Sequence, residues 1–425
     1  MKDFKRGIPM ILEKGSAPNR PIKVLNDVRR VYLPLAYGDQ RQLTPVVADY
    51  DTVERGGLLG RPTNSEEAAL YSSVTGVVAG MTHIQHPIHG ELTCSVVDRI
   101  LTEEPIDEPI PQMPDDLTAE DILTRCQNAA IVDEIDGVPL HTKLRAWADF
   151  DTPLCLLLDA VEPEPYQSSA YAVLKTYGKQ ALIGLRLAAK ATGIPMTRIL
   201  LHTAQNRVRK MAAQFDPNDV RELKRRRYPV FNKEPAGYEG KCGFIGAQAC
   251  LALYRAVVFG TPHTDGILTV AGDALEISYN LQVPFGTPIE DALQACGIGK
   301  NVSLLLIGDA LTGVETTDRS LPILPGMTCL VALRDPIPYR VRSCIGCGQC
   351  AAVCHKGLLP YEIAKRYENM QYERLTVLEP EDCDGCGVCT AVCPAHRPIA
   401  QTVLQASTSA DGTIFVDWGD ESWNP

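Results

Sequence analysis

The chain has 425 residues, of which 45% are hydrophobic and 22% are charged, and its formal net charge at pH 7 is −11. This composition is that of ordinary globular proteins, and the length predicts about two to four domains. The acidic balance argues against a nucleic-acid-binding protein, which would carry a basic patch. No uncharged apolar stretch reaches about 18 residues, so no transmembrane segment is expected. The first residues lack the continuous apolar region of a secretory signal, which predicts a cytoplasmic protein.

The N-terminal region is predicted to form short strands. Apolar and polar residues alternate over residues 32–78 with frequent glycine, a pattern typical of such strands. The segments 53–60 and 72–78 resemble the paired hairpins of a lipoyl- or biotinyl-type barrel sandwich. No lysine stands at a hairpin tip between them. A swinging-arm cofactor is therefore not expected, and we interpret the module as structural or docking.

Two further features precede the central domain. Three histidines recur with a spacing of three, at His83, His86 and His89. Because a proline and a glycine in the same segment predict a turn, we interpret the histidines as part of a polar loop rather than as a metal site. Residues 103–117 are rich in proline and acidic residues and are predicted to be a linker.

Residues 118–271 are predicted to alternate between helices and apolar strands. Thr118–Asp121 resembles a capping box that opens a helix, and Gly193 ends a helical pattern. The predicted helices are 122–131, 168–192 and 248–258, and the predicted strands are 153–159, 198–203 and 266–271. This alternation favours a parallel sheet with helices on both faces. From Gly272 to about residue 333 the chain is strand-rich with one short helix at 289–295, which indicates a small β-grasp unit.

Fifteen cysteines dominate the chemistry of the sequence. Seven are scattered and are interpreted as buried, inert thiols: Cys94, Cys126, Cys155, Cys242, Cys250, Cys296 and Cys329. The other eight form two runs, Cys344-Ile-Gly-Cys347-Gly-Gln-Cys350-Ala-Ala-Val-Cys354 and Cys383-Asp-Gly-Cys386-Gly-Val-Cys389-Thr-Ala-Val-Cys393. Each run has the C-x₂-C-x₂-C-x₃-C spacing of bacterial ferredoxins with two [4Fe–4S] clusters. Structural zinc is the alternative, but zinc sites are usually built from two separated cysteine pairs, which these runs fit poorly.

In such runs the first three cysteines bind one cluster and the fourth binds the other. Cluster I is therefore predicted to be bound by Cys344, Cys347, Cys350 and Cys393. Cluster II is predicted to be bound by Cys383, Cys386, Cys389 and Cys354. Glycine suits loops whose amides turn inward toward sulfide, and the runs contain Gly346, Gly348, Gly385 and Gly387. His355 follows Cys354 where a proline is usual, which removes no ligand.

Nearly the whole chain resembles RnfC, the iron–sulfur subunit of Rnf ferredoxin:NAD electron-transport complexes, and its paralogues. The matching segments are 4–8, 21–25, 31–35, 72–78, 162–166, 270–274, 285–288, 354–360 and 393–398. The resemblance implies a multidomain α/β plus α+β protein. In chain order it has a barrel sandwich, a complex-I-flavoprotein-like α/β domain, a β-grasp unit of the soluble-ligand-binding (SLBB) type and a two-cluster ferredoxin-like domain. The predicted boundaries are 1–102, a linker at 103–117, 118–260, 261–335, 336–400 and a tail at 401–425.

In this family the α/β domain is similar to a flavoprotein that binds FMN and NADH through a glycine-rich loop. The matching stretch here is residues 133–144, which is one residue shorter and keeps few of the glycines. Acidic residues at 133, 134 and 136 stand where a phosphate would need backbone amides, and like charges disfavour anion binding. The resemblance implies that any bound FMN would contact Gly137, Lys143, Asp159, Glu162 and Glu164.

We predict an RnfC-like iron–sulfur protein that relays single electrons through two [4Fe–4S] clusters to a partner protein, with a degenerate FMN and NADH site. Two alternatives are an FMN-containing subunit that oxidises NADH and feeds the clusters, and a scaffold protein that the clusters stabilise. The resemblance implies redox partner proteins, either membrane subunits of an Rnf-type complex or a soluble reductase. With Rnf-type partners the chain would lie at the inner face of the cell membrane. No catalytic acid, base or nucleophile is implied.

Overall fold

The computed structural model describes residues 6–9, 14–37, 41–64, 66–100, 117–149, 153–224, 227–229, 234–235, 238, 240–299, 301–334 and 340–410. The chain divides into two compact units. The smaller unit combines Met1–Ile11, Arg226–Phe231 and Ile337–Pro425, and the larger unit holds Leu12–Arg225 and Asn232–Pro336. All but the last residue of the predicted linker at 103–117, and the last fifteen residues of the predicted tail, lie outside the described residues.

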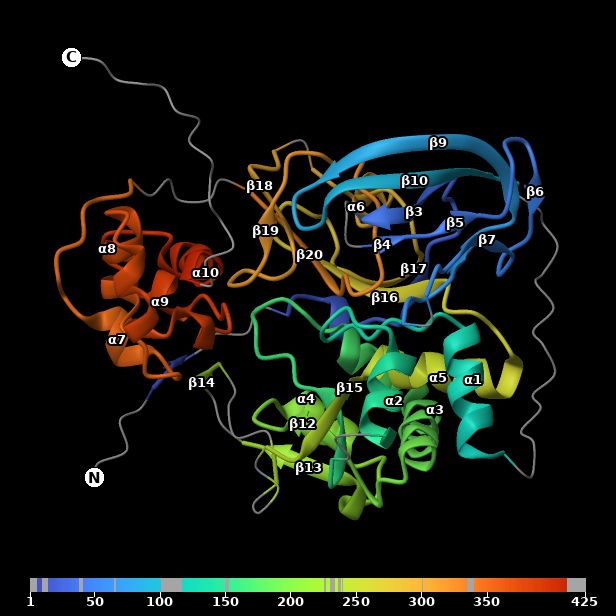
Figure 1. Ribbon diagram of the computed structural model, residues 1–425, viewed down its shortest axis with the longest axis horizontal. Coiled ribbons are helices and arrows are strands. Elements are labelled where there is room, and N and C mark those ends of the chain that lie inside the picture. Colours follow the sequence, from blue (N-terminus) through green and yellow to red (C-terminus); the bar gives the residue numbers. More distant parts are fainter. Residues whose placement is uncertain are drawn as a thin grey trace. The chain divides into compact units, whose positions relative to one another are not determined.

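Two antiparallel sheets form the N-terminal part of the larger unit (Figure 1). Their strand orders are β4-β3-β10-β9-β6 and β5-β7-β8. The strands are β3 (Arg30–Tyr37), β4 (Arg41–Gln42), β5 (Thr44–Pro45), β6 (Thr52–Val53), β7 (Leu58–Arg61), β8 (Leu70–Tyr71), β9 (Gly76–His86) and β10 (Gly90–Arg99). The short strands predicted for residues 32–78 are therefore confirmed.

The three histidines near the end of β9 do not form a polar loop. His83 and His86 belong to the strand, because pairing with β10 continues to the Gly90–His86 position, and only His89 lies in the turn. The His86 side chain is buried, and its Nδ1 accepts the backbone N–H groups of Ile88 and His89 at 3.2 and 3.4 Å. The loop prediction was wrong for the first two histidines, since the turn begins later than proline and glycine suggested.

A six-stranded mixed sheet with the order β19-β18-β20-β16-β17-β2 makes up another part of the larger unit. Its elements are β2 (Lys23–Val24), β16 (Asp265–Ala271), β17 (Tyr279–Pro284), α6 (Ile289–Ala295), β18 (Leu304–Ile307), β19 (Val314–Glu315) and β20 (Cys329–Leu333). β16 pairs in parallel with β20 and antiparallel with β17, and α6 has the predicted bounds. Side chains from this sheet and from the N-terminal strands share one core, which includes Val31, Leu33, Leu268 and Leu281.

The α/β part is built on a parallel sheet with the order β13-β12-β11-β15. Its strands are β11 (Cys155–Ala160), β12 (Met196–His202), β13 (Val220–Leu223) and β15 (Cys242–Gly246). Its helices are α1 (Ala119–Asn128), α2 (Leu140–Asp149), α3 (Ser169–Thr192), α4 (Asn206–Ala212) and α5 (Ala247–Phe259). The predicted capping box is present at Thr118 and Asp121, and Gly193 ends α3 with a φ of 73°.

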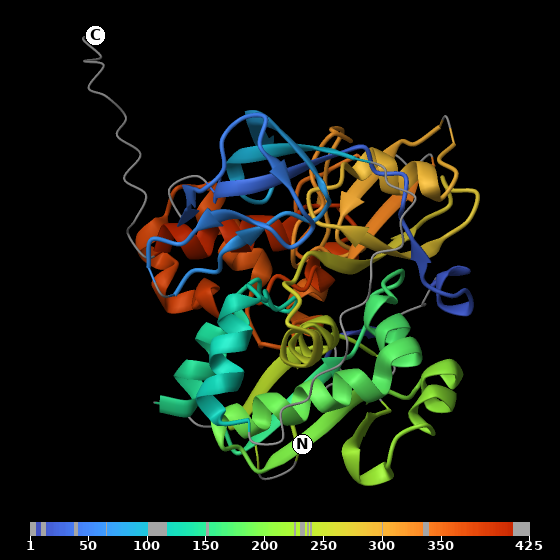
Figure 2. The same cartoon turned by 90° about the vertical axis from the view of Figure 1, so that its right-hand side faces the viewer.

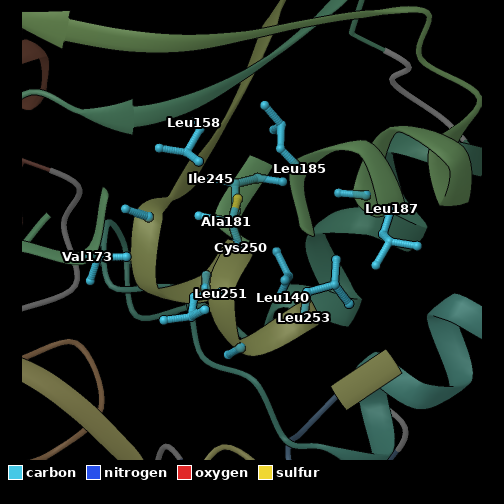
Figure 3. Close-up of a cluster of buried hydrophobic side chains, with 14 of the residues drawn as sticks. Leu140, Leu158, Val173, Ala181, Leu185, Leu187, Ile245, Cys250, Leu251 and Leu253 are labelled. Carbon is cyan, nitrogen blue, oxygen red and sulfur yellow. The ribbon is translucent and has the colours of Figure 1, made fainter. Parts of the chain in front are cut away.

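The helices of the α/β part pack on one face of its sheet. Leu158 of β11 and Ile245 of β15 meet Leu185 of α3 and Leu253 of α5 in one core (Figure 3). α3 and α5 lie side by side (Figure 2), and α1, α2 and α4 contribute to the same core. Helices were expected on both faces of the sheet, but the helices of the described residues lie on one face only. Right-handed crossovers from β11 to β12 and from β12 to β13 place α3 and α4 on the same side, and α5 joins them.

The contact between α3 and α5 depends on Gly184. A Cβ atom at this position would lie 1.8 Å from the carbonyl oxygen of Cys250 in α5. We expect Gly184→Ala to lower the free energy of unfolding by about 1–3 kcal/mol, because the helices must separate. Chemical denaturation measures this, with the exposed Lys190→Ala on the same helix as a control that should shift by less than about 0.5 kcal/mol. Equal effects of the two substitutions would contradict the packing argument.

The smaller unit is mainly helical in its described residues. Its elements are the paired strands β1 (Ile8–Pro9) and β14 (Arg227–Tyr228), the helices α7 (Gln349–Val353), α8 (Pro360–Glu368), α9 (Val388–Ala391) and α10 (Ile399–Ala410), and the 3₁₀ turns η3 (Tyr372–Arg374), η4 (Thr376–Leu378) and η5 (Pro380–Asp382). Its core includes Ile363, Leu375 and Val403. The predicted domain end at residue 400 falls inside α10, which continues for ten more residues. The remaining 3₁₀ turns, η1 (Ala17–Asn19) and η2 (Pro217–Asp219), belong to the larger unit.

Candidate functional site

Two loops of the same shape precede α7 and α9 in the smaller unit. Each loop carries the first two cysteines of one run and leads into a helix that begins one residue before the third cysteine. Four glycines of these loops take left-handed conformations, with φ values of 69° at Gly346, 71° at Gly348, 68° at Gly385 and 74° at Gly387. L-residues rarely adopt this region, so the loop shape depends on glycine. This agrees with the role expected for these four positions.

The eight cysteines of the two runs line two separate cavities. The first cavity is lined by Cys344, Cys347, Cys350 and Cys393. The second cavity is lined by Cys354, Cys383, Cys386 and Cys389. Each cavity thus gathers three thiols from one run and the last thiol from the other, which are the two sets named from the sequence. A set of four thiols is the donor set that a [4Fe–4S] cluster takes, so the residues present fit that group.

The two cavities differ in exposure. In the first, Cys344 and Cys347 are exposed and Cys350 is buried. In the second, Cys389 is buried and the other three thiols are half-buried. Burial raises the pKa of Cys389 to about 12, so the free thiol holds its proton at neutral pH. Because iron binds the thiolate, loading this cavity releases protons.

An ion pair links the two runs beside the second cavity. His355 Nε2 lies 2.7 Å from Asp384 Oδ2, and the backbone N–H of Cys386 donates to Asp384 Oδ1 at 3.4 Å. Burial opposes ionisation of Asp384, but the hydrogen bond and charge of His355 outweigh it and lower the pKa of Asp384. His355, the residue that departs from the usual proline, therefore holds the segment after Cys354 against the facing loop. No pattern in the sequence pointed to this partner.

In the α/β part, the lysine implied as an FMN contact donates all of its hydrogen bonds to groups of the protein itself. Lys143 Nζ donates to Asp133 Oδ2 and Asp136 Oδ2, both at 2.7 Å, and to the carbonyl oxygen of Phe244 at 3.0 Å. An ammonium group has three donors, so none is left for a ligand. Burial disfavours the charged form, but Asp133 and Asp136 outweigh it and raise the pKa of Lys143.

Glu134 occupies the N-terminus of α5. Its carboxyl oxygens accept the backbone N–H groups of Gln248 at 2.7 Å and Ala249 at 3.0 Å. A helix N-terminus is a ready-made binding site for phosphate and other anions. A Cβ atom on Gly246, the residue that caps α5, would lie only 2.0 Å from the Glu134 carboxyl carbon. The chain's own side chain therefore fills the position where an external phosphate could bind.

The other residues implied by the flavoprotein resemblance also bind the protein itself. Glu162 accepts the N–H of Ala170 in the first turn of α3 at 2.7 Å. Glu164 accepts the N–H of Leu311 at 3.0 Å and the hydroxyl of Thr312 at 2.6 Å. Asp159 accepts the N–H of Val161 at 2.9 Å, and Gly137 turns the loop with a φ of 74°. Only Lys143 and Asp159 of the five line the cavity beside Trp147 and Phe244. The residues present do not fit FMN.

Sequence reasoning missed two buried groups that complete this arrangement. Asp309 accepts the backbone N–H of Tyr166 at 2.9 Å and that of Gln167 at 2.6 Å. Lys14 donates to the carbonyl oxygen of Glu162 at 2.9 Å and also contacts that of Gln167. Both residues are far in sequence from the segment they hold. No local pattern in the sequence could have pointed to them.

Two family models match the chain. The model described as "RnfC Barrel sandwich hybrid domain" matches residues 2–100. The model described as "4Fe-4S dicluster domain" matches residues 343–396. One relative, a subunit of the Na⁺-translocating ferredoxin:NAD⁺ oxidoreductase complex of Acetobacterium woodii, is 25% identical over 87% of this chain and 88% of its own length.

Over most of its length the chain is therefore similar to RnfC-like proteins. A second relative, from the proton-translocating ferredoxin:NAD⁺ oxidoreductase complex of Clostridium ljungdahlii, is 24% identical over 85% of this chain and 83% of its own length. A chain of an NAD⁺-reducing [NiFe]-hydrogenase is 13% identical with a TM-score of 0.42, over 69% of this chain and 61% of that one. The dicluster domain at residues 343–396 makes the present chain an iron–sulfur electron-transfer protein. Within the described residues, no helix is both long and apolar enough to cross a bilayer.

Proposed function

We propose that this chain is a flavin-free relay that holds two [4Fe–4S] clusters and passes single electrons between two protein partners. The observation that carries the proposal is the division of eight thiols into two cavities, each lined by both runs. When bound, [4Fe–4S] clusters supply one-electron redox chemistry. The role of the protein is to hold the thiols in place and to set the polarity around them.

Both runs contribute to both cavities, and this has a structural consequence. Cys350 lies in the first turn of α7 and Cys354 directly follows the helix, so one short helix connects the first cavity to the second. In the same way, Cys389 lies in α9 and Cys393 follows two residues after its end. These helices fix the spacing of the two thiol sets. The backbone N–H of Gly346 points to Cys344 Sγ at 3.5 Å, and hydrogen bonds of this kind to cluster sulfurs help set the reduction potential.

The proposed function includes no flavin because the side chains of the α/β part that could bind one already bind other protein groups. Lys143 is neutralised by two aspartates, and Glu134 fills the N-terminus of α5. The two glutamates of the second flavin element hold α3 and the loop at Leu311. With these groups committed, we infer that the α/β part supports the fold and the docking of partners.

We further propose the partners, location and modules that the family suggests. The partners are redox proteins, either membrane subunits of an Rnf-type complex or a soluble reductase, and the chain works in the cytoplasm at the inner face of the membrane. The four modules keep the order predicted from the sequence, with the last one extended to the end of α10. The mixed sheet with α6 is proposed as an SLBB-like β-grasp, since it combines a hairpin, one helix and a parallel pair between β16 and β20.

An anaerobic absorbance spectrum of the purified protein tests this function. We expect a broad iron–sulfur band that NADH leaves unchanged and that dithionite bleaches, because the clusters are present and the flavin site is filled. Extraction with acid should release no stoichiometric FMN. Bleaching by NADH together with bound flavin would instead favour the NADH-oxidising alternative. Clusters that cannot be reduced without unfolding would favour the scaffold alternative.

A further inference from the structure

The first cavity opens to solvent at a loop that is both apolar and positively charged. Val341 and Ile345 are 59% and 69% exposed, although aliphatic side chains of this size are usually buried. Val341 precedes Cys344 by three positions, and Ile345 lies between the two exposed thiols, Cys344 and Cys347. Electron transfer between proteins weakens steeply with distance, so an exposed ligand loop is where a redox partner must approach. The apolar side chains give such a partner a surface to bind.

Exposed cationic side chains lie on this loop and beside it. Arg340 and Arg342 are exposed, and the backbone N–H of Arg342 donates to the carbonyl oxygen of Ala395, which lines the first cavity. Lys365 also lines that cavity and is exposed. In the described part of the chain, none of these three side chains forms an ion pair. The remaining charged residues of the cavity, Arg397 and Glu368, neutralise each other.

The second cavity has the opposite charge. Four carboxyl groups precede or belong to its loop within residues 379–384, and all four are exposed. They are Glu379, Glu381, Asp382 and Asp384, of which Asp384 is paired with His355. Lys356 lines this cavity, and Arg6 Nη1 donates to the carbonyl oxygen of His355 at 3.1 Å, so two cations lie beside the three carboxyl groups that remain. The smaller unit is therefore electrically asymmetric, with its positive side at the exposed thiols.

We propose that Arg340, Val341, Arg342, Ile345 and Lys365 form a docking port for an acidic electron-carrier protein. This inference rests on the proposed relay function and names the partner class for one end of it. The chain as a whole carries a net charge of −11, so its net charge repels an acidic partner while the cations of the port attract it. Such a charge pattern steers a partner into one orientation and raises its association rate. The acidic side at the second cavity excludes the same partner.

Charge reversal at the port tests the proposal. The probe is a chemically reduced, acidic bacterial ferredoxin, mixed anaerobically with the cluster-loaded full chain, and the readout is the second-order rate of cluster reduction at low ionic strength. We expect R340E/R342E to lower this rate about tenfold or more and to flatten its dependence on salt. The matched control is R29E/R61E, which reverses two exposed arginines of the larger unit and should leave the rate unchanged.

Two further measurements keep the outcomes distinct. The iron content of each variant and its bleaching by dithionite must match those of the wild type. A wild-type protein that holds no iron, or that dithionite does not bleach, would overturn the relay function rather than the port. If R340E/R342E does not load clusters, R340Q/R342Q is used in its place, and the salt dependence of the wild-type rate is measured. A wild-type rate that does not fall with added salt, or equal effects of the port and control variants, would overturn the port.

Discussion

Cys393→Ala is expected to remove about half of the iron from the protein, since one of two [4Fe–4S] clusters loses a ligand. The lost cluster should be the one at the first cavity, although Cys393 belongs to the second run in sequence. This follows because Cys393 lines the first cavity together with Cys344, Cys347 and Cys350. Iron analysis and the EPR spectrum of the dithionite-reduced protein measure the loss. Cys296→Ala, at a buried thiol outside both cavities, should keep all of the iron.

Double variants decide which cysteines share a cluster. C344A/C393A should lose no more iron than either single variant, because both residues serve the same cluster. C354A/C393A should lose nearly all of it, because the two residues serve different clusters. The opposite pattern, with C344A/C393A losing both clusters, would show that each run binds its own cluster. The assignment of cysteines to clusters would then be wrong, although the protein would still bind two [4Fe–4S] clusters.

Local signals in the sequence predicted several elements of the larger unit. The capping box at Thr118 and Asp121, the helix stop at Gly193 and the helix at Ile289–Ala295 all depend on neighbours within a few residues. Such features are visible in the sequence because a hydrogen bond or a left-handed turn forms within one element. The cysteine spacing is another local signal, because the three cysteines of each ligand loop lie within seven residues and their thiols identify the kind of cofactor.

Contacts between distant segments could not be predicted in this way. The sequence suggested that acidic residues replace the phosphate site, but not that Glu134 reaches the N-terminus of α5, more than a hundred positions later. Nothing in it indicated that the N-terminal strands and the mixed sheet share one core. It also placed helices on both faces of a sheet that carries them on one. In each case the outcome depends on which surfaces meet after folding, and residue spacing does not encode that.

Glu134 is expected to be one of the most sensitive positions of the larger unit. Glu134→Ala leaves the N–H groups of Gln248 and Ala249 without acceptors, and we expect the free energy of unfolding to fall by about 2–4 kcal/mol. Denaturation at pH 7 measures this, with Glu54→Gln at an exposed position as the control. A loss no larger than that of the control would show that the two hydrogen bonds contribute little.

The stability contributed by Glu134 should also depend on pH. Burial and the neighbouring Asp133 raise the pKa of Glu134 to about 8, above the value of about 4.3 of an unfolded chain. Between these values the folded state binds a proton that the unfolded state has lost, so stability falls as pH rises, by at most about 1.4 kcal/mol per pH unit. Glu134→Gln should remove this contribution. Unfolding curves from pH 5 to 8 should therefore be flatter for the variant than for the wild type, and parallel curves would contradict the shift.

Inorganic phosphate should partly rescue Glu134→Ala. If the Glu134 carboxyl group stands where an external anion would bind, its removal opens the N-terminus of α5, whose amides and helix dipole favour a phosphate. We expect phosphate to raise the melting temperature of the variant more than chloride does at the same ionic strength, and to affect the wild type equally little with either salt. An equal response of the variant to both anions would mean that the helix end collapses or fills with water. The claim that this side chain replaces a cofactor phosphate would then fail.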